Sequence, residues 1–163
     1  MTKAILVRRL TPDDWPVWRE VRLASLAEAP HAYGSSLARE QRFGEDDWRL
    51  RLEPASGMAA VAVLGDRPVG AVGGYTPNGA DAVTLVAMWA HPQVRGLGVG
   101  DALIGEVLTW ARENRWSRVD LRVADGNAAA RRLFVRNGFV PTGHREPLES
   151  DPSIGTEILS RTV

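Results

Sequence analysis

Closely spaced glycines give the sequence its clearest chemical signal. Arg95, Gly96, Gly98 and Gly100 follow a continuous apolar run over Val83–Ala90, and a helical pattern begins directly after them. The first N–H groups of a helix have no partner within the helix, and the helix dipole makes that end partly positive. Glycines lack a Cβ atom and let an anion approach such N–H groups closely. The stretch therefore predicts an anion-binding loop between a strand and a helix, or else a glycine-rich turn without a ligand.

Two common nucleotide-binding patterns do not fit this loop. A P-loop ends in Gly-Lys-Ser/Thr, but the only lysine of the chain is Lys3. The dinucleotide fingerprint requires Gly-x-Gly-x-x-Gly in the first βαβ unit, whereas this loop lies past mid-chain and its last glycine spacing is one residue shorter. Both patterns are therefore excluded. Asp101, in the first turn of the expected helix, suits the helix dipole but repels a phosphate.

Two segments resemble the GNAT superfamily of N-acetyltransferases. Residues 95–100 are similar to its Arg/Gln-x-x-Gly-x-Gly/Ala loop, which binds acetyl-coenzyme A. Residues 127–139 are similar to a second signature of the superfamily, Asn-x-x-Ala-x-x-Leu-Tyr-x-x-x-Gly-Phe. The identical positions in this second segment are Asn127, Ala130, Leu133, Gly138 and Phe139. Because the order of elements around both motifs also matches, the resemblance covers nearly the whole chain, least clearly before Glu45 and after Arg145.

Apolar runs and turn signals predict the elements that position these motifs. Strands are expected over residues 5–10, 59–64, 69–75, 83–90, 119–123 and 156–161, with one more starting at 139–140. Helices are expected from an N-cap at Asp13 to about Glu28, and over residues 45–52, 98–114 and 128–137. A loop containing Pro147 and Pro152 is expected before the last strand. The sum is an α/β (α+β) fold of the GNAT type, with a mixed, mostly antiparallel sheet of about seven strands, a central parallel pair, and about four helices on its faces.

Composition indicates one globular domain over residues 1–163. The chain is 44% hydrophobic and 25% charged, and its net charge of +0 gives no footprint for nucleic acid or an anionic membrane. No apolar run is long enough for a membrane span and no signal-peptide pattern is present, so a cytoplasmic protein is expected. The absence of cysteine excludes disulfides, thiolate metal sites and an acyl-cysteine enzyme, and no metal is expected.

The resemblance implies where acetyl-coenzyme A lies. In the superfamily, the strand before the glycine loop and the next parallel strand splay apart and hold the pantetheine arm; here these are residues 83–90 and 119–123. Splayed strands leave backbone groups unpaired, and pantetheine amides can satisfy them. The cofactor contacts implied are the main chain of Met88, Trp89 and Ala90, the N–H groups of Arg95, Gly96, Leu97, Gly98, Val99, Gly100 and Asp101, and the side chain of Asn127.

One position departs from the superfamily pattern. Phe134 stands where the pattern has a tyrosine, which is commonly assigned as the acid that protonates the departing coenzyme A thiolate. Phenylalanine cannot donate a proton. A thiol has a pKa near ~8.5, so the thiolate can leave unaided. Alternatively Tyr33 or Tyr75 donates the proton, or the protein binds the cofactor and catalyses poorly; the first two explanations are preferred together.

No motif identifies the base that must take a proton from the acceptor amine. In the superfamily it is often a carboxylate on the strand before the glycine loop, but residues 83–90 contain none. The candidates are Glu28, His31, Glu40, His91 and His144. Glu40 and Tyr33 are the chosen catalytic candidates, because their segment corresponds to the acceptor-side loop of the superfamily. A backbone N–H near Met88 or Trp89 is expected to polarise the thioester carbonyl.

The resulting hypothesis is an acetyl-coenzyme A-dependent N-acetyltransferase, an acyltransferase that moves the acetyl group directly to an amine without an acyl-enzyme. A small-molecule acceptor is favoured, and the sequence leaves its identity open. One alternative is a protein lysine or N-terminal acetyltransferase, which needs an open groove for a peptide. Another is a catalytically weak coenzyme A-binding regulatory module, which the missing tyrosine and base would suit. Neither nucleic acid nor a membrane is an expected partner, and a homodimer is compatible with the six tryptophans.

Overall fold

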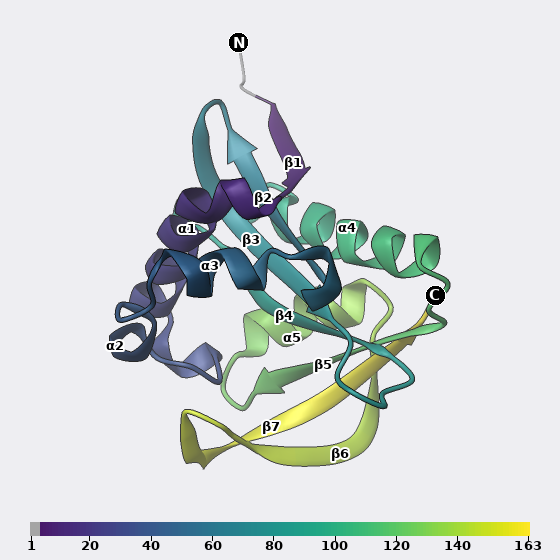
Figure 1. Cartoon of the computed structure of the whole chain (residues 1–163). Helices are drawn as coiled ribbons and strands as arrows, with labels where there is room; N and C mark the ends of the chain where they lie inside the picture. Colours follow the sequence, from purple (N-terminus) through teal and green to yellow (C-terminus); the bar gives the residue numbers. More distant parts are fainter. Residues whose placement is uncertain (1–3) are drawn as a thin grey trace.

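A seven-stranded mixed sheet runs through the structure, a computed structural model that describes residues 4–163 (Figure 1). The strands follow the spatial order β1-β2-β3-β4-β5-β7-β6. Their bounds are β1 Ile5–Arg9, β2 Met58–Leu64, β3 Arg67–Tyr75, β4 Val83–Ala90, β5 Arg118–Ala124, β6 Val140–Leu148 and β7 Asp151–Thr162. Neighbouring strands in this sheet are antiparallel except for β4 and β5. The expected mixed, mostly antiparallel sheet with a central parallel pair is therefore confirmed.

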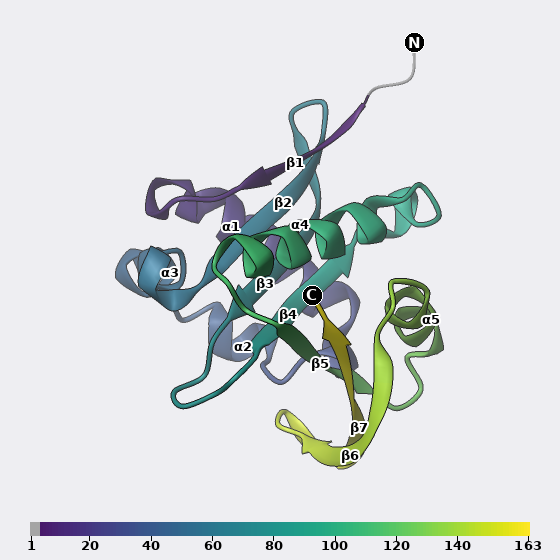
Figure 2. The ribbon, with the colours of Figure 1, turned by 90° about the vertical axis from the view of Figure 1, so that its right-hand side faces the viewer.

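Helices cover both faces of the sheet, as Figure 2 shows. The α-helices are α1 Trp15–Glu28, α2 Leu37–Glu40, α3 Glu45–Arg51, α4 Val99–Glu113 and α5 Ala128–Arg136. Short 3₁₀ turns are η1 Pro12–Asp14, η2 Pro30–Ala32, η3 Pro54–Ser56 and η4 Pro92–Val94. Residues of α1 and α3 belong to one buried cluster and residues of α4 and α5 to the other. None of the helices within residues 4–163 has the length and apolar character needed to cross a bilayer.

The central strands contribute to both clusters. On β2, Ala60 and Ala62 pack in the cluster of α4, whereas Ala59 and Val61 pack in the cluster of α1. Successive side chains of a strand point to opposite faces, so a strand covered on both sides must be apolar throughout. This explains the continuous apolar runs that mark these strands in the sequence.

β4 and β5 form a fork. They pair at two positions, Val83 with Val119 and Thr84 with Asp120, and then separate. The separation confirms the splayed parallel pair that the family resemblance implied. It leaves backbone groups on the facing edges without a partner in the sheet, and such groups must find partners elsewhere.

β4 also bends where the fork opens. Ala71 pairs with Trp89 and Gly73 pairs with Val86, so β4 has one residue more than β3 between these pairs. Within this bulge Ala87 has φ 57, which is unusual for a residue with a side chain. A bulge of this kind re-aims the strand and interrupts its ladder.

Three local features differ from the sequence predictions. Residues 37–40 form the helix α2, which is too short to show a helical period in the sequence. The N-cap of α1 is Asp14 rather than Asp13, because a 3₁₀ turn precedes the helix. The loop expected around Pro147 and Pro152 is instead part of β6 and β7. β6 is an edge strand, where a proline is tolerated, and Pro152 precedes the part of β7 that pairs with β5.

Substitutions at Ala87 test the strain in the bulge. Ala87→Gly is expected to raise the free energy of unfolding by up to about 1 kcal/mol, because glycine adopts this φ without the penalty of an L side chain. Ala87→Val should lower it by about 1–2 kcal/mol, because valine is β-branched. Urea denaturation measures both. Ala90→Gly, in the same strand but outside the bulge, is the control and should lower it by about 0.5–1 kcal/mol; an equal loss for Ala87→Gly would contradict the assignment.

Candidate functional site

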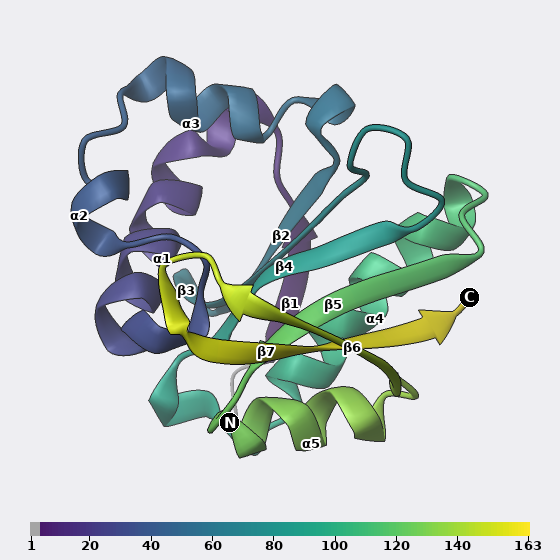
Figure 3. The ribbon, with the colours of Figure 1, turned by 90° about the horizontal axis from the view of Figure 1, so that it is seen from below.

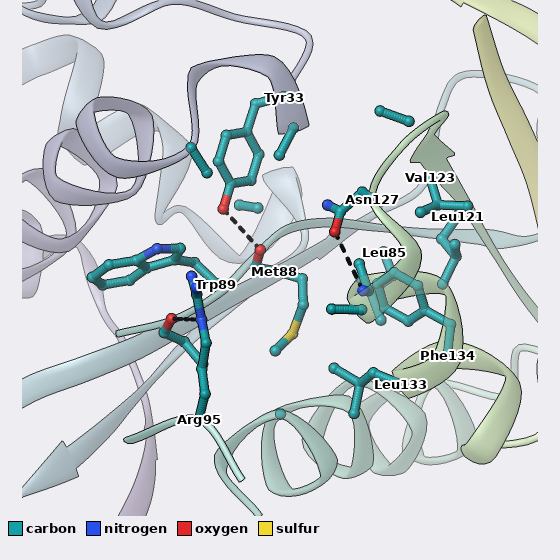
Figure 4. A pocket seen from close by; sticks show the side chains of 18 of the residues that line it. Tyr33, Leu85, Met88, Trp89, Arg95, Leu121, Val123, Asn127, Leu133 and Phe134 are labelled. Atoms are coloured by element: carbon teal, nitrogen blue, oxygen red, sulfur yellow. Dashed lines mark hydrogen bonds between the residues drawn. The ribbon is translucent and has the colours of Figure 1, made fainter. Parts of the chain in front are cut away.

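One continuous cleft lies at the fork (Figure 4). Its volume of about 1130 Å³ exceeds the ~300–1,000 Å³ of most small-ligand pockets. The end of α1 with η2, the strands β4 and β5, the glycine loop and the helix α5 line it. The residues expected from the sequence that line the cleft are Tyr33, Met88, Trp89, Ala90, Arg95, Gly96, Gly98, Val99, Gly100, Asp101 and Asn127. Leu97 lies outside this lining and is 62% exposed.

The glycine loop leads from β4 into α4. Gly98 precedes the first helical residue and has φ 83, a left-handed conformation that favours glycine. A Cβ atom on Gly100 would lie 2.7 Å from Leu133 Cδ2, so glycine at this position lets α5 pack directly on the first turn of α4. The N–H groups of that first turn have no partner within the helix, and their residues line the cleft. This end of the cleft can therefore bind an anion.

The Asp101 carboxylate, which could have opposed such an anion, is bonded to α5. It accepts a hydrogen bond from Asn137 Nδ2 at 2.8 Å and from Arg136 Nη2 at 3.0 Å. The bond from Asn137 and then the charge of Arg136 hold the pKa of the Asp101 carboxyl below its usual range, against an opposing effect of burial. Its repulsion of a phosphate is therefore reduced, and Arg136 itself lines the cleft.

The Arg95 side chain turns away from the glycine loop. Its Nε donates to Ala90 O at 3.1 Å, and its Nη2 donates to Glu28 Oε1 at 2.9 Å. Glu28, the last residue of α1, also accepts from Trp89 Nε1 at 3.0 Å. One carboxylate thus joins α1, β4 and the glycine loop. The sequence offered Glu28 as a candidate base, but no pattern in it showed this connection.

Tyr33 lies on the α1 side of the fork. Its ring is buried and its hydroxyl donates to Met88 O at 3.0 Å, beside the bulge of β4 (Figure 4). Burial raises the pKa of Tyr33 to about 12, although the nearby charge of Arg22 acts in the opposite direction. The hydroxyl therefore keeps its proton near neutral pH and can act as a donor. The carbonyl of Met88 has a second lone pair and can still accept another hydrogen bond.

Asn127 and Phe134 bring α5 to the cleft. Asn127 Oδ1 accepts from Ala130 N at 3.3 Å, so this side chain caps α5 while it lines the cleft. Phe134 is 4% exposed and packs edge-on against Phe139, with ring centroids 6.0 Å apart. The position that holds the superfamily tyrosine therefore presents an apolar ring to the cleft (Figure 4).

The structure does not bring Glu40 to the cleft. Its side chain is 0% exposed and lies between two arginines, with Oε2 accepting from Arg22 Nη2 at 3.0 Å and Oε1 from Arg51 Nη1 at 2.8 Å. Burial alone would raise the pKa of the Glu40 carboxyl, but the bonds and charges of the arginines outweigh it and hold the pKa below its usual range. The expectation that Glu40 takes a proton from the amine finds no support in this geometry.

Of the other candidate residues, some line the cleft and others do not. Glu28 and His31 line the cleft, whereas His91 and His144 do not. Tyr75, the other tyrosine considered as a proton donor, lies at the end of β3 outside the lining. Within residues 4–163, no group of three histidine, aspartate or glutamate side chains is close enough to hold a metal ion.

Comparison with known proteins agrees with this geometry. A family model described as the acetyltransferase (GNAT) family matches residues 17–139. This chain belongs to that family. Over 95 residues it is 32% identical to N-acetyltransferase 8F1 of Rattus norvegicus, a match that covers 56% of this chain and 43% of that protein. The chain thus spans less than half the length of this curated relative.

Two solved structures show that the fold is shared. Ribosomal-protein-alanine N-acetyltransferase from Brucella melitensis superposes with a TM-score of 0.78 at 17% identity, covering 97% of this chain and 99% of that chain. The protein yncA from Salmonella typhimurium, solved with its cofactor acetyl-coenzyme A, superposes with a TM-score of 0.78 at 16% identity, covering 98% of this chain and 94% of that chain. At these identities the likeness concerns the fold alone.

The buried charges around Glu40 predict a pH-dependent stability. Glu40→Gln leaves Arg22 and Arg51 without their counter-charge, so the free energy of unfolding at about pH 7 should fall by about 3–5 kcal/mol. Because the folded-state pKa of Glu40 is lowered, its contribution is complete above the unfolded pKa of about 4.3 and is lost as the pH falls through the folded pKa. The difference between wild type and variant in urea denaturation should therefore shrink in acid.

Glu45→Gln is the matched control, because Glu45 forms an exposed pair with Arg49 on α3. It should change stability little at any pH. A difference between wild type and Glu40→Gln that stays constant from neutral to acid pH would contradict the charged role of Glu40.

Proposed function

We propose that this chain is an acetyl-coenzyme A-dependent N-acetyltransferase that moves the acetyl group directly to the amine of a small-molecule acceptor. The observation that carries the proposal is the single cleft, which runs from the glycine loop through the fork to Tyr33. Two reactants held in one cleft can meet in the orientation that direct transfer requires. The chain has no cysteine, so transfer would not pass through an acyl-cysteine.

The residues of the cleft suit acetyl-coenzyme A, which would supply the acetyl group as a thioester. The N–H groups from Arg95 to Asp101, except that of Leu97, would hold the pyrophosphate at the start of α4. The Leu97 N–H donates to Val94 O at 3.2 Å. Main-chain groups of Met88, Trp89 and Ala90 that β5 leaves without a partner would hold the pantetheine amides, together with the side chain of Asn127. The shared fold with yncA, which was solved with acetyl-coenzyme A, supports this assignment.

Tyr33 is the proposed proton donor for the departing thiolate. Its hydroxyl reaches Met88 from the α1 side of the sheet, whereas Phe134 lies on the α4 side. A phenol that stays protonated can supply a proton as the thiolate leaves. The proton donor would then lie on the α1 side of the sheet, opposite the position of Phe134, where the superfamily pattern has its tyrosine.

His31 is the proposed base, in place of Glu40. His31 and Glu28 both line the acceptor end, but the Glu28 carboxylate is already held by Trp89 and Arg95. His31 is exposed, and histidine is the side chain that most often acts as a general base. An exposed base that lines the cleft can take a proton from an amine and pass it to solvent.

Two other functions stay as alternatives. The Brucella melitensis enzyme is a ribosomal-protein-alanine N-acetyltransferase, so a protein amino terminus is the second candidate acceptor. Against it, the β6–β7 hairpin lies beside the segment after α1, where Ser150 donates to Tyr33 O at 2.6 Å (Figure 3). The apolar Phe134 favours a coenzyme A-binding regulatory module, which would bind the cofactor and acetylate no amine.

Thermal unfolding tests the cofactor site. At ~100 times its Kd, acetyl-coenzyme A adds about 2.7 kcal/mol, and a chain of this size gains roughly 2–4 °C per kcal/mol, so a shift of several degrees is expected. Gly98→Glu, which places a carboxylate at the expected pyrophosphate position, should abolish the shift. Gly79→Glu is the control, because Gly79 has a similar φ of +73 and open space around it but lies outside the cleft. An equal shift for Gly98→Glu and wild type would contradict the site.

Turnover tests the role of Tyr33. Release of coenzyme A over a panel of primary amines should fall at least ~10-fold in kcat for Tyr33→Phe, with little change in the KM of acetyl-coenzyme A. Tyr75→Phe, which alters the other tyrosine of the chain, should leave both values unchanged. Full activity of Tyr33→Phe would show that the thiolate leaves without a donor.

A further inference from the structure

An arginine outside the cleft lies over the ring of Tyr33. The guanidinium carbon of Arg22 is 5.0 Å from the centroid of that ring. Arg22 comes from the middle of α1 and its side chain is 11% exposed, so the contact is largely shielded from water. A cation over an aromatic face is attracted by the ring electrons, and the attraction grows when water is excluded. The contact therefore restricts how the ring of Tyr33 can turn.

Glu40 fixes the orientation of Arg22. Its Oε1 accepts from Arg22 Nε at 3.1 Å and its Oε2 from Arg22 Nη2 at 3.0 Å, a two-bond arrangement that restricts the guanidinium more than one bond would. Arg51 then binds Glu40 Oε1 from the other side at 2.8 Å. The guanidinium of Arg51 lies 4.5 Å from the ring centroid of Phe43, which limits its movement. Glu40 and Arg51 thus hold Arg22 in place while its guanidinium lies over the ring of Tyr33.

The main chain of Tyr33 is fixed independently of Arg22. Ser150 Oγ donates to Tyr33 O, which ties the residue to the β6–β7 hairpin. The freedom that remains is rotation of the side chain, and this rotation decides whether the hydroxyl reaches Met88 O. Arg22 contacts the ring, which is the part of Tyr33 that can still move.

We propose that Arg22 is a positioning residue for Tyr33 and that Glu40 acts by holding Arg22 in place. This inference rests on the proposed role of Tyr33 as proton donor. The competing explanation is that the pair of Arg22 and Glu40 only joins α1 to α2. A purely structural pair would affect stability, but it would not act on turnover through the hydroxyl of Tyr33.

The first test is a double-mutant cycle. Arg22→Met combined with Glu40→Met removes both buried charges together, because loss of one partner alone would leave an uncompensated charge and could unfold the protein. Arg51 is 35% exposed and can turn to solvent. We expect kcat over the primary-amine panel to fall about 10-fold, with less than about 2-fold change in the KM of acetyl-coenzyme A. In a Tyr33→Phe background the same change should lower kcat less than about 2-fold.

Two further variants make this cycle decisive. Arg22→Lys keeps a cation near the ring but loses the two-bond contact, so its kcat should lie between wild type and the double variant. Arg49→Met removes an exposed arginine of α3, bonded to Asp13 and Glu45, and should leave kcat unchanged. An equal loss of kcat in the wild-type and Tyr33→Phe backgrounds would overturn the proposal.

The second test needs no acceptor. Tyr75→Phe leaves Tyr33 as the only tyrosine of the chain, so ¹³C-labelled tyrosine gives NMR signals from this ring alone. In the Arg22→Met/Glu40→Met variant these signals should shift and broaden, while Arg49→Met should leave them in place. Unchanged signals would overturn the proposal. Failure of acetyl-coenzyme A to bind, or of every amine to react, would instead overturn the proposed function and leave the NMR result to decide the positioning of Tyr33.

Discussion

The incomplete pairing of β4 and β5 is the constraint on which the rest of the structure depends. Two backbone pairs join the strands, and beyond them the edges of a parallel pair lie open inside the molecule. Open edges cost free energy unless their polar groups find partners. Side chains from outside the sheet supply two of these partners, since Tyr33 donates to Met88 O and Arg95 donates to Ala90 O. The segments that carry Tyr33 and Arg95 are therefore held at positions from which these side chains reach the open carbonyls of β4.

The two walls of the fork are stabilised by different physical means. On the α4 side, apolar contacts dominate, with Leu133 seated against Gly100 and a long amphipathic helix against the sheet. On the α1 side, the segment after α1 is built from short helices and turns, which have few internal hydrogen bonds. Its fixed points are charged or polar, namely Glu40 between two arginines and Ser150 on the carbonyl of Tyr33. The α1 side of the fork therefore depends on charge and pH more than the α4 side does.

Local sequence signals predicted what depends on neighbours in the chain. The apolar run of β4, the glycines before α4 and the cap of α5 each follow from residues within one segment, and the structure has all three elements. Contacts between distant segments left no such signal. The sequence could not show that Arg95 turns to Glu28, 67 positions away, or that Glu40 meets Arg22 inside the molecule. The strands around Pro147 were also missed, because proline argues against a strand unless the strand is known to lie at an edge.

The contact of Gly100 with Leu133 joins the two sequence motifs into one packing unit. Leu133 occupies the space that a methyl group on residue 100 would need, so a larger residue at position 100 requires Leu133 to shift. The helix that carries Asn127 and Phe134 is thereby held in a fixed register with the start of α4. An alanine at position 100, which the loop pattern of the superfamily allows, would accordingly require the Leu133 side chain to move. A substitution in one motif therefore changes the packing of the other, although they lie far apart in the chain.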